Sequence, residues 1–406
     1  MEANRFTSIH RLGGSYMPER YQQLDALRGL AALTVVLQHF LSVLPSMDAH
    51  SDNAWVNLWK YSPLHITWAG YEAVIFFFIL SGFVLSLPFY GDRNTQYSSY
   101  AFKRICRIYL PYVVAILIAM LVSMSFSKGD FAGASDWFNG LFKDDFTWKS
   151  MFQHMFLIGI FDFKAFNPVV WSLIHEMRIS LIFPFIMFFV VNRLNWKITL
   201  SVAVILSVIG SVLNSKFSTP ATVTIHYFIT IHYIAMFIVG ALLAKHRYSW
   251  IHWFKNVQKS LRVTGLLIGV LAYTYSYWFF PGISFIHLRL IDNWVISLGA
   301  VLFIMFSLTS QTVSQLLAKS ALLFVGKTSY SIYLYHLIVL YVFMQFFNDN
   351  LPLWVIYILT LVVTFVLSKF AYSHIELPSV AIGKWGAKYI KRGEKSNKAP
   401  SAQTTT

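Results

Sequence analysis

Arg28 and His39 are the residues whose types and spacing most directly suggest chemistry. They stand eleven positions apart in a largely apolar run, residues 24–44, with the sequence LDALRGLAALTVVLQHFLSVL. Eleven steps of about 100° bring an α-helix almost back to its starting azimuth, so both side chains lie on one face, about 16 Å apart along the axis. Ionisable groups inside a membrane-length helix are costly and usually face a bundle interior or a wet cavity. The pair therefore predicts a reaction site or a solute pathway inside a helical bundle.

Further charged groups open another apolar segment, FKRICRIYLPY. Arg104 and Arg107 are i and i+3, so they share a helix face, and Lys103 adjoins them. Two guanidiniums on one face suit phosphate groups, because each can form bidentate hydrogen bonds. The simpler interpretation is that they are positively charged anchors at the inner membrane surface.

Two more ionisable residues fall inside apolar segments. Glu176 ends NPVVWSLIHE, and a rise of 1.5 Å per residue places it about 10 Å below the outer boundary, at the level expected for His39. His336, in TSYSIYLYHLIV, is expected about 10 Å above the inner boundary, where it could neighbour Arg28. His39 could act as a general base, with Glu176 orienting it or positioning an acceptor. A single histidine in a membrane is, however, more often a hydrogen-bond partner between helices.

The composition predicts an all-α integral membrane protein. Of 406 residues, 57% are hydrophobic and only 12% are charged, which excludes an ordinary soluble domain. A short apolar stretch near 151–163 contains Asp162 and is expected to be re-entrant or interfacial. Ten spans are expected, at about 22–44, 66–88, 105–126, 170–192, 197–214, 226–245, 261–280, 293–310, 329–347 and 353–373.

The distribution of basic residues predicts the orientation of these spans. With both termini cytoplasmic, 22 of the 32 Lys and Arg residues lie on the inner side. The net charge of +15 is then explained by anionic lipid and membrane topology, without nucleic acid as a partner. We expect a cytoplasmic segment 1–21, a membrane domain 22–375, and a basic, disordered cytoplasmic tail 376–406. The first span should remain as an anchor, and the single cysteine, Cys106, excludes an internal disulfide and a cysteine-based metal site.

Three classes of function are compatible with polar groups that recur from the inner face to the outer third. One is an enzyme that takes an anionic donor from inside and an acceptor from outside. The second is a transporter of an anionic solute or a lipid-linked sugar, and the third is a silent scaffold in a glycan-assembly complex. A transporter needs no thioester and leaves its substrate chemically unchanged, so dependence on coenzyme A would discriminate between the first two.

Five motifs occur in a fixed order: LDALRGLAALTVVLQH, FFFILSGFVLS, FKRICRIYLPY, NPVVWSLIHE and SYSIYLYHLIV. Together they resemble the membrane-bound acyltransferase family 3, whose members O-acylate carbohydrates such as the O-antigen of lipopolysaccharide. The resemblance implies a ten-helix domain in the bacterial inner (plasma) membrane that takes acetyl groups from cytoplasmic acetyl-CoA and uses no metal. It favours the enzyme over the transporter.

The resemblance also assigns roles to residues. It implies that His39 is catalytic, as a general base on a sugar hydroxyl, with Arg28 beside it. Arg104 and Arg107, with Lys103, would meet the phosphates of coenzyme A. The family's Trp-Ser-Leu-x-x-Glu pattern matches Trp171, Ser172, Leu173 and Glu176.

The remaining matches allow two interpretations. Tyr333 and His336 match the family's late helix, where an interior hydrogen-bonded histidine is an equal explanation. Ser81 and Gly82 of the SGF turn could simply permit close helix packing. One departure is Ile75, where the family often has an acidic or amide residue. Glu72 lies three residues earlier on the same face, and its role is open.

Overall fold

The computed structural model describes residues 21–47, 54–90, 96–126, 129–142, 147–280, 283 and 287–397, and every regular element in them is a helix. Nine helices in this part of the chain are long and apolar enough to cross a membrane. The protein is therefore a multi-pass membrane protein. Six of the nine are single helices: Gln22–Leu41 (α1), Tyr97–Ser125 (α4), Trp196–Phe217 (α8), Tyr227–Lys245 (α9), Arg289–Thr309 (α12) and Ser320–Phe347 (α14). Two others continue into a short turn of different helix type: Gly70–Tyr90 is α3 (Gly70–Ser86) with η3 (Leu87–Tyr90), and Val170–Val191 is α7 (Val170–Ile186) with η4 (Met187–Val191). The ninth, Leu353–Lys391, comprises α15 (Leu353–Ala371), η5 (Tyr372–Glu376) and most of α16 (Leu377–Asn397).

Ten spans were expected, and the one that is not among these nine, 261–280, corresponds to α11 (Lys259–Trp278). Its 20 residues give about 30 Å of helix, which is enough to cross. It is missing from the nine because it is less apolar, with Lys259 and Arg262 in its first turn. The stretch near 151–163 forms only α6 (Trp148–Met155), whose eight residues reach about 12 Å, so the prediction that it does not span is confirmed.

Short helices complete the described fold at the ends of the bundle. They are η1 (Pro45–Met47), α2 (Ala54–Lys60), η2 (Pro63–Thr67), α5 (Asp136–Asn139), α10 (Arg247–Asn256) and α13 (Gln311–Leu317).

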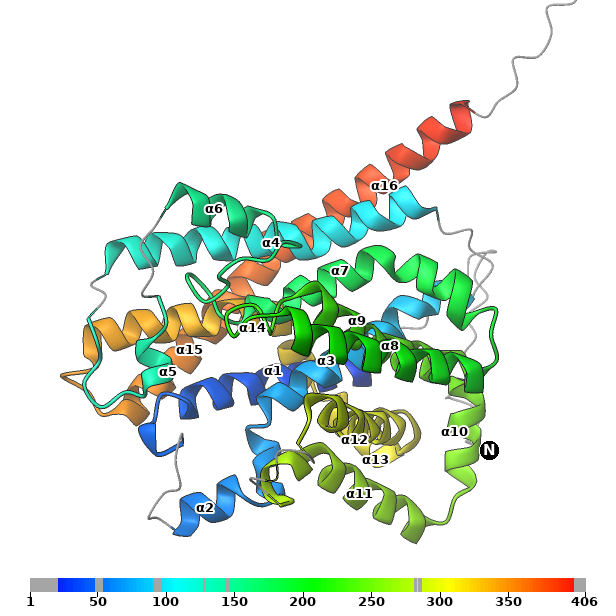
Figure 1. The fold of residues 1–406 in the computed structure, drawn as a ribbon, viewed down its shortest axis with the longest axis horizontal. Helices are drawn as coiled ribbons and strands as arrows, with labels where there is room; N and C mark the ends of the chain where they lie inside the picture. The colour runs from blue at the N-terminus through cyan, green and yellow to red at the C-terminus, as the bar shows by residue number, and fades with distance from the viewer. Residues whose placement is uncertain are drawn as a thin grey trace, which may run out of the picture.

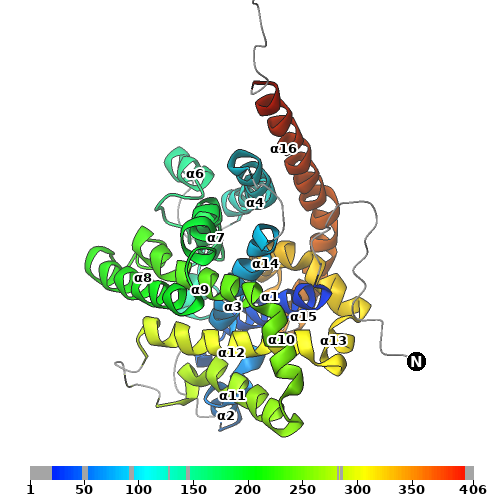
Figure 2. The ribbon, with the colours of Figure 1, turned by 90° about the vertical axis from the view of Figure 1, so that its right-hand side faces the viewer.

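The centre of the bundle is formed by α1, α3, α9 and α14, and the other long helices surround them (Figures 1 and 2). α3 and α9 are apolar on all sides, which is the pattern of a helix buried by others on every face. α8 and α15 lie at the periphery and leave many of their apolar side chains exposed, as expected for helices that face lipid.

Glycines allow the central helices to touch backbone to backbone. A Cβ added at Gly29 of α1 would lie 2.6 Å from the backbone nitrogen of Gly326 on α14. Gly82 of α3 packs in the same way on the carbonyl of Phe237 in α9. The packing role considered for Gly82 is therefore confirmed. Small residues at helix crossings are the usual means of close approach in a membrane.

The prediction that residues 376–406 form a disordered tail is wrong for most of that segment. Residues Leu377–Asn397 form α16, which continues from α15 through the π-helical turn η5 and packs along α4 (Figure 1). Gly383 and Gly386 meet Cys106 and Phe102 on α4, so small residues give α16 a complementary face despite its charge. Residues 398–406 lie outside the described residues. The cytoplasmic location of both termini remains a prediction.

Candidate active site

His39 and His336 form a hydrogen-bonded pair, with 2.8 Å between His39 Nδ1 and His336 Nε2. Their rings are stacked at 5.1 Å between centroids. His336 is fully buried, whereas His39 is half-buried. The two residues that the sequence placed at different depths are therefore in direct contact.

Backbone hydrogen bonding determines which nitrogen of each ring carries the proton. His336 Nδ1 lies 3.0 Å from the carbonyl oxygen of Ile332, which can only accept, so His336 Nδ1 donates. In neutral His336 the other nitrogen, Nε2, is then an acceptor, and His39 donates to it from Nδ1. His39 Nε2 consequently carries a lone pair and has no hydrogen-bond partner among the described residues. This is the state that a general base requires.

The register of α1 against α14 explains why the two histidines meet. Gly29 contacts Gly326, and each histidine follows its glycine by ten residues. The two helices run parallel and both finish at the left of Figure 1, so equal steps from one contact lead to a second contact about 15 Å away. The expected depth of His336 was wrong because α14 begins at Ser320, well before residue 329.

Trp137 covers the outer side of His39. The two rings are parallel, with an interplanar angle of 2° and 5.5 Å between centroids. Trp137 lies on the short helix α5, which is fixed to the end of α1 because the backbone N–H of Ser135 donates to the Val43 carbonyl at 2.8 Å. Sequence patterns could not predict this contact, because it joins a tryptophan of a short helix to a long helix far away in the chain.

The WSL motif lies next to the histidine pair. Ser172 Oγ and Tyr333 Oη are 2.7 Å apart, and Tyr333 donates to the carbonyl of Val169 at 2.8 Å, so Ser172 is the donor to Tyr333. The ring of Tyr333 is 6.2 Å from that of His336. Trp171 stacks on Tyr71 of α3 rather than on either histidine.

A second polar cluster lies toward the beginnings of α1 and α4. Arg104 donates to Glu176 at 3.2 Å and to Ser180 at 3.0 Å, and Ser81 also donates to Glu176, at 3.4 Å. Arg28 pairs with Asp25 at 3.2 Å. Arg28 and Arg104 are therefore each neutralised by a carboxylate.

Arg107 differs from the other two arginines. Its guanidinium lies within electrostatic range of Arg28, Arg104, Glu176 and Glu376, but it remains exposed and makes no hydrogen bond to the described residues. Glu376 is instead the acceptor for the backbone N–H and the hydroxyl of Ser331. Arg107 thus keeps its donors available for an anion. Lys103 is also exposed, and its backbone packs toward Gly383 of α16.

The predicted positions of Glu176 and Arg28 relative to the two histidines are wrong. Glu176 does not share the level of His39, and Arg28 lies with the arginines rather than beside His39 or His336. The cause is the segment before α7, which runs into the bundle: buried Asn167 donates to the carbonyl of Leu334 at 2.9 Å, next to the histidine pair. α7 therefore begins at the depth of that pair, and Glu176 lies about 9 Å deeper.

Arg178 and His154 hold this incoming segment. Arg178 donates to the carbonyls of Ile158 and Gly159, at 2.8 and 2.5 Å. His154 donates from Nδ1 to the Ser150 carbonyl at 2.8 Å, and burial lowers the pKa of its ring below the usual value. His154 is therefore neutral at physiological pH and has a structural role.

Glu72 is separate from this site. It is buried, lies 3.2 Å from His65 and accepts a hydrogen bond from Ser276 of α11 at 3.3 Å. None of these contacts joins Glu72 to the histidine pair or to the arginine cluster, and the question whether it substitutes for an acidic residue at position 75 stays open. Among the described residues, no group of three or more His, Cys, Asp or Glu side chains could hold a metal ion.

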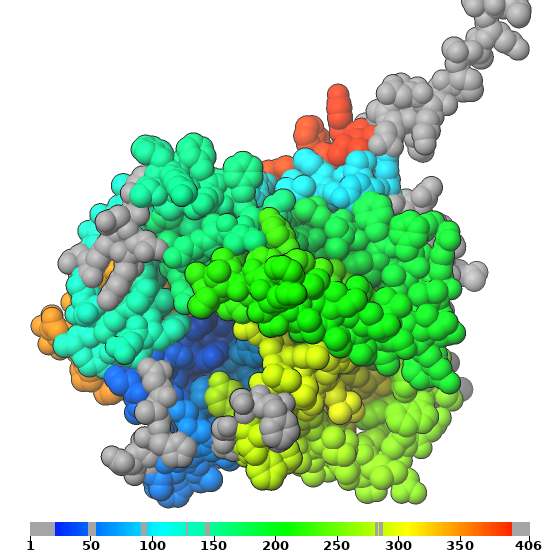
Figure 3. All heavy atoms as spheres, viewed as in Figure 1, coloured from blue at the N-terminus to red at the C-terminus, as the bar shows by residue number. Residues whose placement is uncertain are grey.

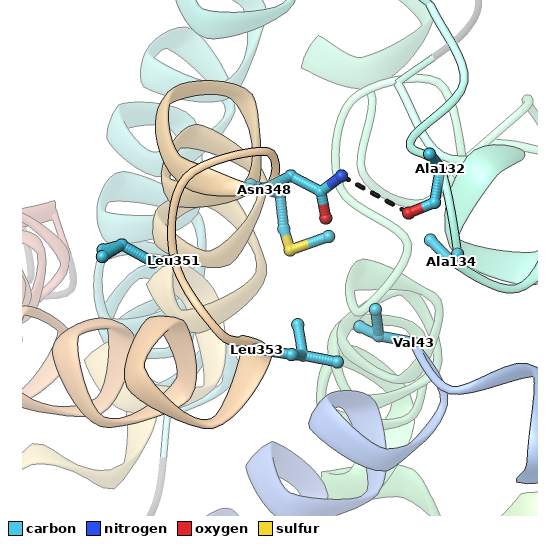
Figure 4. A pocket seen from close by; sticks show the side chains of 8 residues that line it. Val43, Ala132, Ala134, Asn348, Leu351 and Leu353 are labelled. Carbon is cyan, nitrogen blue, oxygen red and sulfur yellow. Dashed lines mark hydrogen bonds between the residues drawn. The ribbon is translucent and has the colours of Figure 1, made fainter.

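Two cavities among the described residues lie away from the histidine pair. One of about 210 Å³ lies beyond the ends of α1 and α14, where Asn348 points toward the Ala132 carbonyl and the other lining side chains are apolar (Figure 4). A groove of about 400 Å³ lies between α4 and α16 and is lined largely by apolar side chains. The groove includes His374 and Tyr109, but neither cavity is lined by His39 or His336.

Comparison with known proteins identifies the family. A family model described as an acyltransferase domain matches residues 21–372. The chain belongs to this acyltransferase family. It is 23% identical over 391 residues to the O-acetyltransferase OatA of Staphylococcus aureus (strain NCTC 8325 / PS 47), covering 91% of this chain and 58% of the relative. A putative O-acetyltransferase of S. aureus (strain MRSA252) is 23% identical over 412 residues, covering 92% of this chain and 60% of the relative.

A third relative is the acyltransferase MdmB of Streptomyces mycarofaciens, 32% identical over 171 residues, or 41% of this chain and 40% of that protein. The chain thus spans less than two thirds of the length of the curated relatives it matches. No solved structure matches. This acyltransferase chain carries its His39–His336 pair and its arginine cluster within the residues that the family model covers.

Proposed function

We propose that this chain is a membrane O-acyltransferase that moves an acetyl group from cytoplasmic acetyl-CoA to a hydroxyl of a cell-surface or lipid-linked carbohydrate. The observation that carries the proposal is the hydrogen-bond chain from the Ile332 carbonyl through His336 to His39. It leaves His39 Nε2 unprotonated in the interior of a bundle whose family transfers acyl groups. The membrane would be the plasma membrane of a bacterium.

In this mechanism His39 Nε2 removes the proton from the acceptor hydroxyl as its oxygen attacks the thioester carbonyl. The charge that develops on the ring is shared with His336 through the Nδ1 hydrogen bond. The carbon–sulfur bond then breaks, and the imidazolium returns its proton to the departing thiolate. The products are an O-acetyl ester and free coenzyme A, so no redox partner is needed.

The donor would approach from the arginine cluster. Arg107 supplies unused guanidinium donors, while Arg104 and Arg28 lie nearby, each paired with a carboxylate. Nucleotide phosphates suit such a site because guanidiniums bind phosphate oxygens in pairs. The pantetheine arm would then extend between the helices toward His39, past Glu176 and Ser81.

The test is transfer of radiolabel from acetyl-CoA to a crude membrane-glycan extract, with purified protein in nanodiscs. We expect labelled glycan with the intact protein and background label with His39→Ala, which should fold because His39 is only half-buried. Unchanged transfer by His39→Ala at equal protein would refute the proposed base. If acetyl-CoA did not bind at all, a transporter would become the better explanation.

A further inference from the structure

A polar network lies at the starts of α3, α9 and α12, away from the arginine cluster. Tyr71 donates to the side-chain oxygen of Asn293 at 2.9 Å, and the amide of Asn293 donates to His232 Nε2 at 2.8 Å. The other nitrogen of His232 is 2.8 Å from Ser207 Oγ. This chain of hydrogen bonds fixes the hydroxyl end of Tyr71. It is separate from His39 and His336, neither of which takes part in it.

Arg289 stands one helical turn before Asn293 and therefore on the same face of α12. Its guanidinium contacts the carbonyl of Val223 at 3.4 Å, and its electrostatic neighbours are the phenols of Tyr71 and Tyr233. Within the part of the chain that the structure describes, no carboxylate pairs with it. The nearby Asp292 is bound to Tyr275 and His287.

An aromatic pair beside this cation offers surface to a ligand. The rings of Tyr71 and Trp171 are stacked at 6.3 Å, and both are half-buried, so part of each ring stays accessible. The hydroxyl of Tyr233 is fully buried and is hydrogen-bonded to the hydroxyl of Tyr71, so it holds Tyr71 in place. A cation without a carboxylate next to accessible aromatic rings suits a sugar that carries an anionic group.

A chain of side-chain contacts leads from this aromatic pair to the histidine pair. Trp171 precedes Ser172, whose hydroxyl bonds to Tyr333, and the ring of Tyr333 contacts that of His336. Figure 3 shows a hollow bordered by the segment around α5, the green segment between α8 and α9, and the yellow α12, with α1 and α3 at its base. In the predicted orientation α3, α9 and α12 start on the outer side, where an acceptor would arrive.

We propose that Arg289, Tyr71 and Trp171 form the acceptor subsite, and that this subsite takes a sugar bearing an anionic group. The inference rests on the proposed function and narrows its acceptor class. The anion would pair with Arg289, and the sugar face would pack on the Tyr71–Trp171 pair, which Tyr233 holds in place through the hydroxyl of Tyr71. The anionic group is either the carboxylate of an acidic sugar or a phosphate attached to the sugar.

The test is equilibrium binding of radiolabelled glucuronate, glucose 6-phosphate and glucose to the full chain in nanodiscs. We expect one or both anionic sugars to bind about 10- to 100-fold more tightly than glucose, the range for a charge-assisted hydrogen bond. The preferred anion distinguishes the two sources. Arg289→Gln should abolish the preference while keeping a donor for the Val223 carbonyl, and Arg289→Lys should retain part of it.

The matched control is Lys216→Gln, which removes one exposed cation from the end of α8. It should leave the preference unchanged. Equal binding of all three sugars, no measurable binding of the anionic ones, or a preference that survives Arg289→Gln would overturn the inference. Because binding is measured without acetyl-CoA, these outcomes are distinct from failure of acetyl transfer, which would refute the proposed function itself.

Discussion

Replacing His336 tests whether the histidine pair sets the protonation state of the base. In His336→Phe, His39 Nδ1 loses its acceptor. The proton of neutral His39 can then move to Nε2, the atom that has to remain unprotonated. Phenylalanine fills the buried volume, so the helices should stay packed.

The magnitude follows from the lost hydrogen bond. A neutral hydrogen bond contributes about 0.5–1.5 kcal/mol, which changes the ratio of the two tautomers by about 2- to 13-fold. Loss of ring orientation adds to this, so we expect kcat to fall about 10-fold or somewhat more. The effect should be smaller than for His39→Ala, where loss of the base itself costs about 10²- to 10⁴-fold. The KM for acetyl-CoA should not change.

His336→Gln is the matched variant. A glutamine side chain can place its amide oxygen near the position of His336 Nε2 and accept the proton from His39. We therefore expect kcat in the order wild type, His336→Gln, His336→Phe, His39→Ala, measured as radiolabelled acetyl transfer. If His336→Phe equalled the wild type, or if His336→Gln were no better than His336→Phe, the tautomer argument would be refuted.

Three other predictions concern the donor site, the cover over His39 and the helix register. Arg107→Gln should raise the KM for acetyl-CoA about 10-fold or more without lowering the melting temperature. Arg104→Gln should lower the melting temperature because Glu176 loses its partner. Equal effects of the two variants on KM and on stability would contradict the proposal that Arg107 binds the donor and Arg104 pairs with Glu176. Trp137→Ala should lower kcat about 2- to 13-fold, the range for loss of an aromatic pair, with Trp137→Phe closer to wild type, and an unchanged kcat for Trp137→Ala would exclude a role for the stack. Gly29→Val should reduce kcat about 100-fold by shifting α1 against α14. The control Gly265→Val should keep its activity, because an added Cβ there meets nothing within 4 Å. Similar activities of the two variants would show that the Gly29–Gly326 contact does not position the histidine pair.

Sequence reasoning predicted the helices well because hydrophobic length is a strong local signal. It located the spans, the short segment near 151–163 and the polar residues that line the interior. It failed for α16, because the charge and polarity of residues 377–397 outweigh the signal of Gly383 and Gly386. Those glycines matter only once α4 is present beside them.

Contacts within the candidate site were harder to predict than its members. Depth was calculated from assumed helix starts, and both α14 and α7 begin elsewhere: α14 starts early at Ser320, and α7 starts inside the bundle. Because the helices start at these other residues, His336 lies beside His39 and Glu176 lies beside Arg104. One signal was available, since Gly29 and Gly326 each precede their histidine by ten residues. It has meaning only if the two glycines are known to touch.

We propose above all that His39, as general base, catalyses transfer of an acetyl group from a cytoplasmic donor to an acceptor that arrives from the other side of the membrane. The most direct measurement uses right-side-out membrane vesicles loaded with radiolabelled acetyl-CoA, with glycan added outside. We expect labelled glycan in the external medium with the intact chain and none above background with His39→Gln. Label that forms only when donor and glycan share one side, or that is unaffected by His39→Gln, would contradict it.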